Sequence, residues 1–281
     1  MTLGSFYFKS KAKVALKGNW QTALVVTFFA GIITTILSTL SAVSIPDITM
    51  YTTYGQIEQY LVEIQKVSSG IWIAYAVLNV LSFVCTPALL LGSNHYFIER
   101  LRGNDLEVNA LASRANIWLK ALWLHVIMFV RTFLWSLLFI VPGVIAAIRY
   151  SMAPYYLAQD PTMTAMEAIE KSKNSMANMK MSYFSLLISF VGWSLLAMVV
   201  QTMLISMSTI IALVAAQFMQ LMIATYQNAA IASFYITISS ENGVSIAHRE
   251  VRSKMQEMGV DTSTFPDLDQ KSDGDGEDED E

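Results

Sequence analysis

Charged residues and cysteines are scarce in this sequence, and each shortage excludes a class of protein. Only 14% of the 281 residues are charged and 54% are hydrophobic, whereas soluble domains carry about 25% charged residues. A soluble fold of this length would need far more polar surface to cover its core, so the composition predicts an integral membrane protein. The single cysteine, Cys85, excludes an internal disulfide. It falls in an apolar run, where a free cysteine usually packs as a small hydrophobe.

Residues that carry chemistry are also sparse. The three histidines, His95, His125 and His248, are far apart and show no metal-ligand spacing. There is no phosphate loop and no His-Glu-x-x-His motif, and the apolar runs beyond residue 116 contain no Asp or Glu. The string that begins at Gly192 has the Gly-x-Ser shape of intramembrane serine proteases, but those need a histidine on a later span. We therefore expect no enzymatic activity, no metal and no cofactor.

Long apolar runs dominate instead. A helix needs about 20 apolar residues to cross roughly 30 Å of hydrocarbon. The first run is about 24 residues long, too long for the apolar core of a cleavable signal peptide, about 7–15 residues. We predict an all-α, polytopic membrane bundle in the region 21–240. Its six transmembrane helices are expected at residues 21–44, 71–98, 117–141, 143–159, 182–206 and 208–238.

The count of six depends on Pro142 and Gly143. A single helix over residues 117–159 would be about 64 Å long, twice the hydrocarbon thickness. Pro142 has no N–H to donate, and Val141 before it is biased away from the helical conformation. Because Gly143 also permits a turn, we predict a hairpin turn at Pro142–Gly143 on the outer side of the membrane.

Lysine and arginine placement predicts the orientation. With the N-terminus inside, 15 of the 18 Lys and Arg residues lie in cytoplasmic segments and only Lys66 lies in an outer loop. The remaining two, Arg131 and Arg149, fall within spans. Both termini are therefore predicted to be cytoplasmic.

Several segments outside the spans have an amphipathic or charged pattern. We predict a cytoplasmic amphipathic segment at residues 1–20 and a cytoplasmic helix at residues 241–260. The outer loop 45–70 is predicted to contain an amphipathic helix. Thr164 and Glu167 form a capping-box pattern before a further interfacial helix. A three-fold repeat of surface helix plus hairpin is conceivable, but the units share too little sequence to assert it.

The C-terminal segment, residues 261–281, is strongly acidic. It holds ten acidic residues and one lysine, a net charge of −9, so the rest of a chain of net charge −4 carries +5. Its few apolar residues cannot form a core, which predicts a disordered tail. The tail is either a solvated segment or a binding segment for a basic cytoplasmic partner.

Polar residues inside the spans fall into two groups. Gly31 and Gly192 lie in stripes of small residues that predict close packing between helices. Asn79 and Gln217 belong to amide-bearing faces that should point into the bundle, because an amide facing lipid is costly. These amides either bond between helices or line a hydrated cavity.

Arg131 and Arg149 are the charged residues placed within predicted spans. An unpaired arginine at the middle of the bilayer costs at least about 2.5 kcal/mol. Three arrangements remain open: snorkelling to a surface, capping by amides and carbonyls, or binding of a lipid phosphate. With Asn79 and Gln217, these two arginines are the candidate ligand-binding residues, and Pro142, Gly143, Gly31 and Gly192 are the candidate structural ones.

Four motifs occur in a familiar order. They are AKVALKGNW before the first span, PALLLGSNHYFIERLRG at the end of the second, the block from Leu134 to Met176, and FSLLISFVGWSLL in the fifth. Together they resemble the domain-of-unknown-function 975 family of bacterial integral membrane proteins over about residues 9–238. The chain is also distantly similar to the membrane region of some glycerophosphodiester phosphodiesterases, a pointer toward lipids. The resemblance implies a bacterial plasma-membrane protein and no catalytic residues.

Two functional hypotheses follow. The first is a non-enzymatic scaffold or accessory subunit with a membrane-protein partner. The alternative is a binder or transporter of a lipid or amphiphile through a polar pocket between spans. Membrane lipids are expected partners in both, and no nucleic acid is expected in either.

Overall fold

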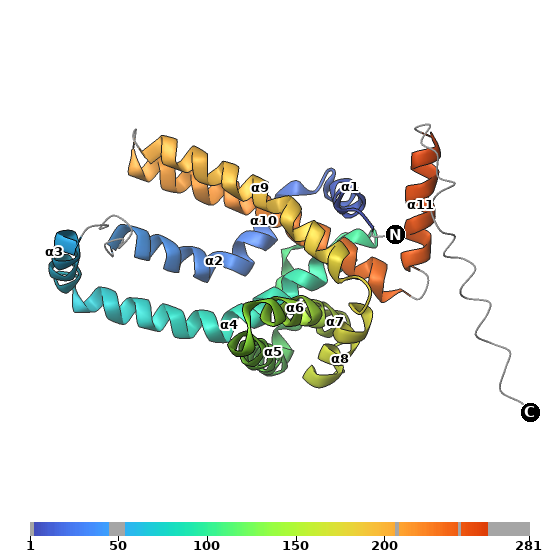
Figure 1. The fold of residues 1–281 in the computed structure, drawn as a ribbon, viewed down its shortest axis with the longest axis horizontal. Helices are drawn as coiled ribbons and strands as arrows, with labels where there is room; N and C mark the ends of the chain where they lie inside the picture. The colour runs from blue at the N-terminus through green and yellow to red at the C-terminus, as the bar shows by residue number, and fades with distance from the viewer. Residues whose placement is uncertain (1–2, 45–53, 206–207, 241–242, 258–281) are drawn as a thin grey trace, which may run out of the picture.

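The computed structural model describes residues 3–44, 54–205, 208–240 and 243–257, and every regular element in these ranges is helical (Figure 1). This confirms the all-α prediction. Among the described helices, five are long and apolar enough to cross a membrane, the third of them together with the 3₁₀ segment before it. They are α2 (Trp20–Ser44), α4 (Ser69–Leu101), η2 (Val108–Ile117) with α5 (Trp118–Leu138), α9 (Lys180–Ile205) and α10 (Thr209–Ser239).

Six shorter helices complete the described part of the chain. They are α1 (Ser5–Leu16), α3 (Tyr54–Gln65), α6 (Ile140–Tyr150), α7 (Ala153–Gln159), α8 (Ala165–Ser175) and α11 (Gly243–Glu257). Helix α3 lies within the predicted outer loop and connects α2 to α4 at the end far from α1 and α11 (Figure 1). The predicted acidic tail lies outside the described residues.

Four of the long helices form two hairpins. Helices α2, α4, α9 and α10 run lengthwise in Figure 1, with α9 paired to α10 and α2 paired to α4, and the two pairs spread apart toward α3. Helix α5 is seen nearly end-on in the same view, so it is steeply inclined to the other four. The five apolar helices therefore do not form one parallel bundle.

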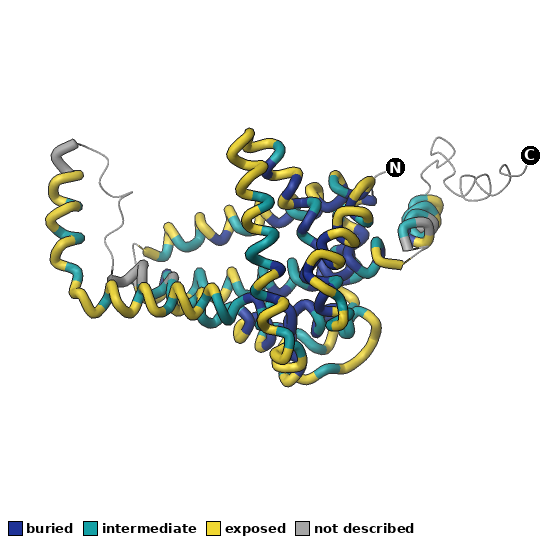
Figure 2. Tube along the Cα trace, turned by 90° about the horizontal axis from the view of Figure 1, so that it is seen from below, coloured by how far each residue is buried: buried dark blue, intermediate teal, exposed yellow. Residues whose placement is uncertain are grey.

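The hydrophobic core sits at one end of these hairpins. Its fully buried aromatic residues include Phe8 from α1, Tyr96 and Phe97 from α4, and Phe234 and Tyr235 from α10. Figure 2 shows the buried positions gathered at this end, while the part of α4 nearest α3 is mostly exposed. Since many exposed residues of the long helices are apolar, their outer surfaces suit lipid contact rather than water.

Helix α1 packs into this core, although the sequence pattern suggests an interfacial helix. One face, which contains Tyr7, Phe8, Ala12 and Leu16, is buried. The Lys9 ammonium donates a hydrogen bond to a backbone carbonyl of α9 at 3.0 Å and lies 4.3 Å from the centre of a phenylalanine ring. This burial lowers the pKa of Lys9. The apolar face of α1 thus packs against the protein core rather than against the membrane surface.

The turn between α5 and α6 lies at Phe139, not at Pro142–Gly143. Phe139 is extended, with φ −160° and ψ 153°, and separates two helices. Pro142 falls in the first turn of α6, where backbone N–H groups have no intrahelical acceptor and proline is tolerated. Gly143 has a packing role, because a Cβ there would overlap Ser136 of α5.

The predicted fourth span, residues 143–159, is two helices in the structure. Helix α6 ends at Tyr150 and α7 begins at Ala153. The buried hydroxyl of Ser172 in α8 stabilises the break, since it donates to the Arg149 carbonyl at 2.8 Å and accepts from the Met152 N–H at 3.2 Å. A serine from α8 thus forms hydrogen bonds with backbone groups that a continuous helix would pair within itself.

Helix α8 begins with the predicted capping box. The Thr164 hydroxyl accepts from the Glu167 N–H at 3.3 Å, and the Glu167 carboxylate accepts from the Thr164 N–H at 2.8 Å. These hydrogen bonds hold the pKa of Glu167 below its usual value. The apolar face of the helix, with Ala168 and Ile169, is buried against α5 and α7, while Lys171 remains exposed.

Candidate functional site: a groove between two hairpins

The two arginines of the predicted ligand site lie apart from the other candidates. Arg131 of α5 is half-buried, and its guanidinium contacts the Met166 sulfur of α8 at 3.7 Å. Arg149 of α6 is half-buried, and its side chain makes no hydrogen bond or ion pair with any residue that the structure describes. Neither arginine is among the described residues that line the three cavities considered below.

Asn79 does not face the interior of the bundle. Its side chain is exposed on the part of α4 toward α3. The amide nitrogen donates to the Tyr75 carbonyl at 2.8 Å, one turn earlier in the same helix. The expectation that this amide bonds between helices is therefore wrong, because its own helix offers a closer acceptor.

Gln217 is the predicted site residue that lines a groove. This groove has a volume of about 450 Å³ and lies between α2 and α10. Its walls combine apolar side chains, hydroxyls and two amides. They are Thr27, Phe28, Gly31, Thr34 and Thr35 of α2, and Gln217, Phe218, Gln220, Leu221 and Ala224 of α10.

A second, smaller cavity shares the same amides. It has a volume of about 270 Å³, lies between α9 and α10, and is lined by both Gln217 and Gln220. Gln201 of α9 lines it from the opposite side, together with Ser194. The two spaces therefore meet at a pair of glutamines three residues apart on α10.

The three amides at these two spaces have no hydrogen-bond partner within the part of the chain that the structure describes. Gln201, Gln217 and Gln220 make no hydrogen bond with any residue in the described ranges. An amide transferred to an apolar environment without a hydrogen bond costs roughly 2–7 kcal/mol. Within a bilayer there is little water to supply that bond. Gln201 and Gln217 are half-buried and Gln220 is exposed, so in an apolar bilayer these amides would need a partner from outside the described residues.

The hydroxyls beside the amides are partly satisfied. Thr27 is buried and donates to the Ala23 carbonyl in its own helix at 2.9 Å. Ser194 lies 3.5 Å from the Phe190 carbonyl in the same arrangement. Hydroxyls bonded in this way keep acceptor capacity only, so Thr27 and Ser194 offer no donor to a ligand, whereas the amides do.

The glycine stripes do not mark close helix packing. A Cβ added at Gly31 or Gly192 would meet no atom of the described chain within 4 Å, apart from its immediate surroundings in the helix. Gly31 lines the groove, so its missing side chain leaves space there. Close approach occurs instead at Gly92, where a Cβ would come within 2.7 Å of the Leu111 backbone.

The groove is built for binding uncharged polar groups rather than for acid–base chemistry. Neither cavity is lined by a titratable side chain. Among the described residues, no three His, Cys, Asp or Glu side chains come together as metal ligands. Gln201 was absent from the sequence-based candidates. Gln220 shares one side of the predicted sixth span with Gln217 but was not named as a ligand-binding residue.

Comparison with known proteins identifies a family and no individual relative. No curated protein and no solved structure matches the chain. A family model described as "Protein of unknown function (DUF975)" matches residues 137–242, which run from the end of α5 through α10. None of these comparisons shows the distant similarity to glycerophosphodiester phosphodiesterases. The match to the family model confirms the family resemblance within residues 137–242.

Proposed function

We propose that this chain is a non-enzymatic integral membrane protein that binds a lipid or similar amphiphile in the groove between α2 and α10. The observation that carries the proposal is the set of unpartnered amides, Gln201, Gln217 and Gln220, in apolar helices. A bound molecule with uncharged oxygen or nitrogen atoms would satisfy them.

The groove has the size and lining of a ligand site. Small-molecule sites usually measure about 300–1,000 Å³ and combine apolar walls with a few placed polar groups. At about 450 Å³ the groove falls in this range. Phe28, Phe218 and Leu221 offer apolar contact for a chain, while Gln217 and Gln220 offer hydrogen bonds. Ester, amide or hydroxyl groups of an amphiphile match this uncharged lining.

We also propose that both termini lie in the cytoplasm and that the protein resides in a bacterial plasma membrane. The positive-inside bias supports this orientation. Figure 1 supports it as well, because α3, which is followed by Lys66, lies at the opposite end from α1 and α8, whose lysines would be cytoplasmic.

The proposed chain path contains three hairpins, α2–α4, α5–α7 and α9–α10. Helices α6 and α7 together contain 18 residues, 11 and 7, or about 27 Å of helix, close to the hydrocarbon thickness. In the six-span arrangement the α5–α7 hairpin would cross and return at a steep inclination to the other four long helices. Each hairpin returns the chain to its starting side, so both ends share one side.

Native mass spectrometry of the gently solubilised protein tests the lipid proposal. The double variant Gln217→Leu, Gln220→Leu removes two amides and leaves apolar groups of similar length. Gln227→Leu is the matched control, since Gln227 lies on α10 but lines neither cavity. We expect the unmodified protein and the control to retain a co-purified amphiphile, and the double variant to lose most of it.

Arg131→Ala provides a second control. Because Arg131 contacts α8 and does not line the groove, this variant should keep the amphiphile. Equal retention in the double variant and in the unmodified protein would overturn the groove as the binding site. Co-purification of a stoichiometric membrane protein with no bound amphiphile would favour the accessory-subunit role instead.

A further inference from the structure

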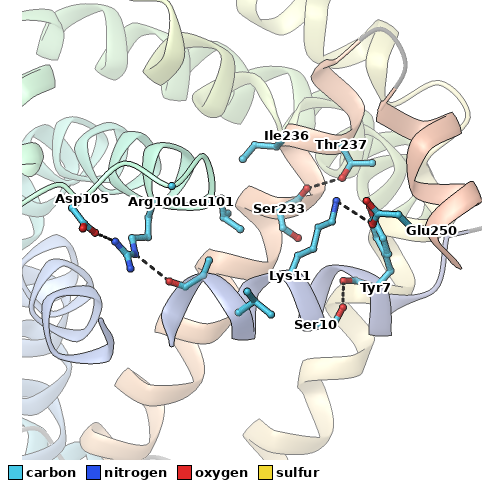
Figure 3. Close-up of a pocket in the computed structure, with 13 residues that line it drawn as sticks. Tyr7, Ser10, Lys11, Arg100, Leu101, Asp105, Ser233, Ile236, Thr237 and Glu250 are labelled. Carbon is cyan, nitrogen blue, oxygen red and sulfur yellow. Dashed lines mark hydrogen bonds and ion pairs between the residues drawn. The ribbon is translucent and has the colours of Figure 1, made fainter. Parts of the chain in front are cut away.

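A second pocket, called the basal pocket below, lies near the other end of α10 from the groove (Figure 3). Its volume is about 600 Å³, and residues of α1, α4, α10 and α11 line it. Ser233 in this pocket is sixteen residues from Gln217, about 24 Å along the helix axis. The pocket is therefore separate from the groove of the proposed function.

Two ion pairs line this basal pocket, and they differ in how far their basic side chains are buried. The Arg100 side chain is 13% exposed, and its guanidinium pairs with Asp105 and donates to the Ala15 carbonyl at 3.1 Å. Lys11 and Glu250 are separated by 3.5 Å and are 42% and 43% exposed. Such exposed pairs contribute about 0–1 kcal/mol. Arg100 is therefore fixed, whereas Lys11 and Glu250 can exchange partners at little cost.

The buried Tyr7 hydroxyl lies at the same place, close to the Glu250 carboxylate. Tyr7 is only 5% exposed, and its oxygen has no hydrogen-bond partner among the described residues. Burial raises the pKa of Tyr7, and the nearby Glu250 carboxylate raises it further, so the hydroxyl keeps its proton. A buried hydroxyl without a partner costs about 1–3 kcal/mol. In Figure 3 it lies next to Lys11 and Glu250.

The charges of the lining residues cancel. Lys11 and Arg100 contribute two positive charges, and Asp105 and Glu250 contribute two negative ones. A simple anion would meet both carboxylates, and a simple cation would meet both basic groups. A molecule that carries both charges can pair with each exchangeable residue and leave the net charge of the pocket at zero.

We propose that the basal pocket binds a zwitterion that carries a phosphate or carboxylate group and an ammonium group. Tyr7 and Lys11 bind the anionic group, and Glu250 binds the ammonium. The molecule is either the headgroup of a zwitterionic phospholipid or a free zwitterion, because both present the same charges.

Calorimetric titration of the purified full chain in detergent tests the proposal. The probes are O-phosphoethanolamine, inorganic phosphate, and short-chain phosphatidylethanolamine with short-chain phosphatidylglycerol as its anionic counterpart. A free-zwitterion site binds O-phosphoethanolamine at least tenfold more tightly than phosphate. A headgroup site binds phosphatidylethanolamine at least tenfold more tightly than phosphatidylglycerol. Either result supports the proposal. If the zwitterion is preferred in neither pair, the proposal is overturned.

Tyr7→Phe separates binding from folding. Loss of one hydrogen bond to a charged group should weaken zwitterion binding about tenfold. The ligand-free variant should melt at the same or a higher temperature, since it loses an unsatisfied hydroxyl. Tyr75→Phe is the matched control, because Tyr75 lies 25 residues before Arg100 on α4, about 37 Å away, and should bind as the unmodified protein does. Unchanged affinity in Tyr7→Phe, or a lower melting temperature without ligand, would contradict the assignment.

Discussion

Replacing Gly92 by alanine tests how closely α4 packs against the segment that follows it. Gly92 is buried in α4, and an added Cβ would lie 2.7 Å from both the Cα and the carbonyl carbon of Leu111 in η2 and would overlap the Leu111 oxygen. All three are backbone atoms, so no side-chain rotation relieves the contact. The segment η2 would have to move away from α4.

The expected magnitude combines two opposing effects. Overpacking of a tight interior costs typically 1–3 kcal/mol, and the rigid backbone neighbours place Gly92→Ala at the upper end, about 3 kcal/mol. Alanine in place of glycine in a helix contributes about 1 kcal/mol of stability. The net destabilisation is therefore about 2 kcal/mol. Gly192→Ala, which meets no neighbour within 4 Å in the described structure, should stabilise by about 1 kcal/mol.

Equilibrium unfolding in mixed micelles, followed by circular dichroism as the denaturing detergent is increased, measures both variants. The account predicts changes of opposite sign, with a difference of about 3 kcal/mol between the two free energies of unfolding. If Gly92→Ala were as stable as Gly192→Ala, the close approach of α4 and η2 would be refuted.

Three further predictions concern the helices around the α5–α6 hairpin. The pKa of Glu167 is lowered in the folded protein, so its stabilising contribution is present above its ordinary pKa and is lost as pH falls through the lower folded value. Thr164→Ala removes half of the capping box. In a pH series, the melting temperature of this variant should therefore fall less on acidification than that of the unmodified protein. Ser172→Ala should cost about 1–3 kcal/mol in the same unfolding assay, because it leaves buried backbone groups unpaired. A cysteine at Phe139, with Cys85→Ala, should react with a membrane-impermeant thiol reagent applied outside cells; labelling only after lysis would contradict six spans.

The sequence predicted the local features of the fold better than their packing. The apolar runs identified the five long helices, and the Thr164–Glu167 spacing identified a capping box, because both depend on residues close in the chain. The break between α6 and α7 could not be predicted in this way. It depends on Ser172, whose hydroxyl reaches back across about twenty residues to bridge Arg149 and Met152.

Proline and glycine were misleading guides to the α5–α6 turn. The pair Pro142–Gly143 suggested a turn, yet proline suits the first turn of a helix and Gly143 makes room for Ser136. The turn falls at Phe139, a residue with no turn preference, because the packing of α5 against α6 decides its position.

The candidate site was predicted in part. Gln217 was identified because an amide in an apolar helix needs a partner, and the structure places it in a groove. Asn79 met the same criterion but bonds to its own helix. The basal pocket was not predicted at all, since Tyr7, Arg100 and Glu250 are brought together only by tertiary packing and look like ordinary surface residues in the sequence.

Photocrosslinking tests the central claim, an amphiphile in the groove between α2 and α10, most directly. The protein would be equilibrated in bilayers that contain a phospholipid with a diazirine on its acyl chain, irradiated, digested and mapped by mass spectrometry. The account predicts adducts concentrated on residues 27–35 of α2 and 217–224 of α10, and their loss in the Gln217→Leu, Gln220→Leu variant. Adducts spread evenly over the exposed apolar faces of α4 and α9, and unchanged by the variant, would contradict it.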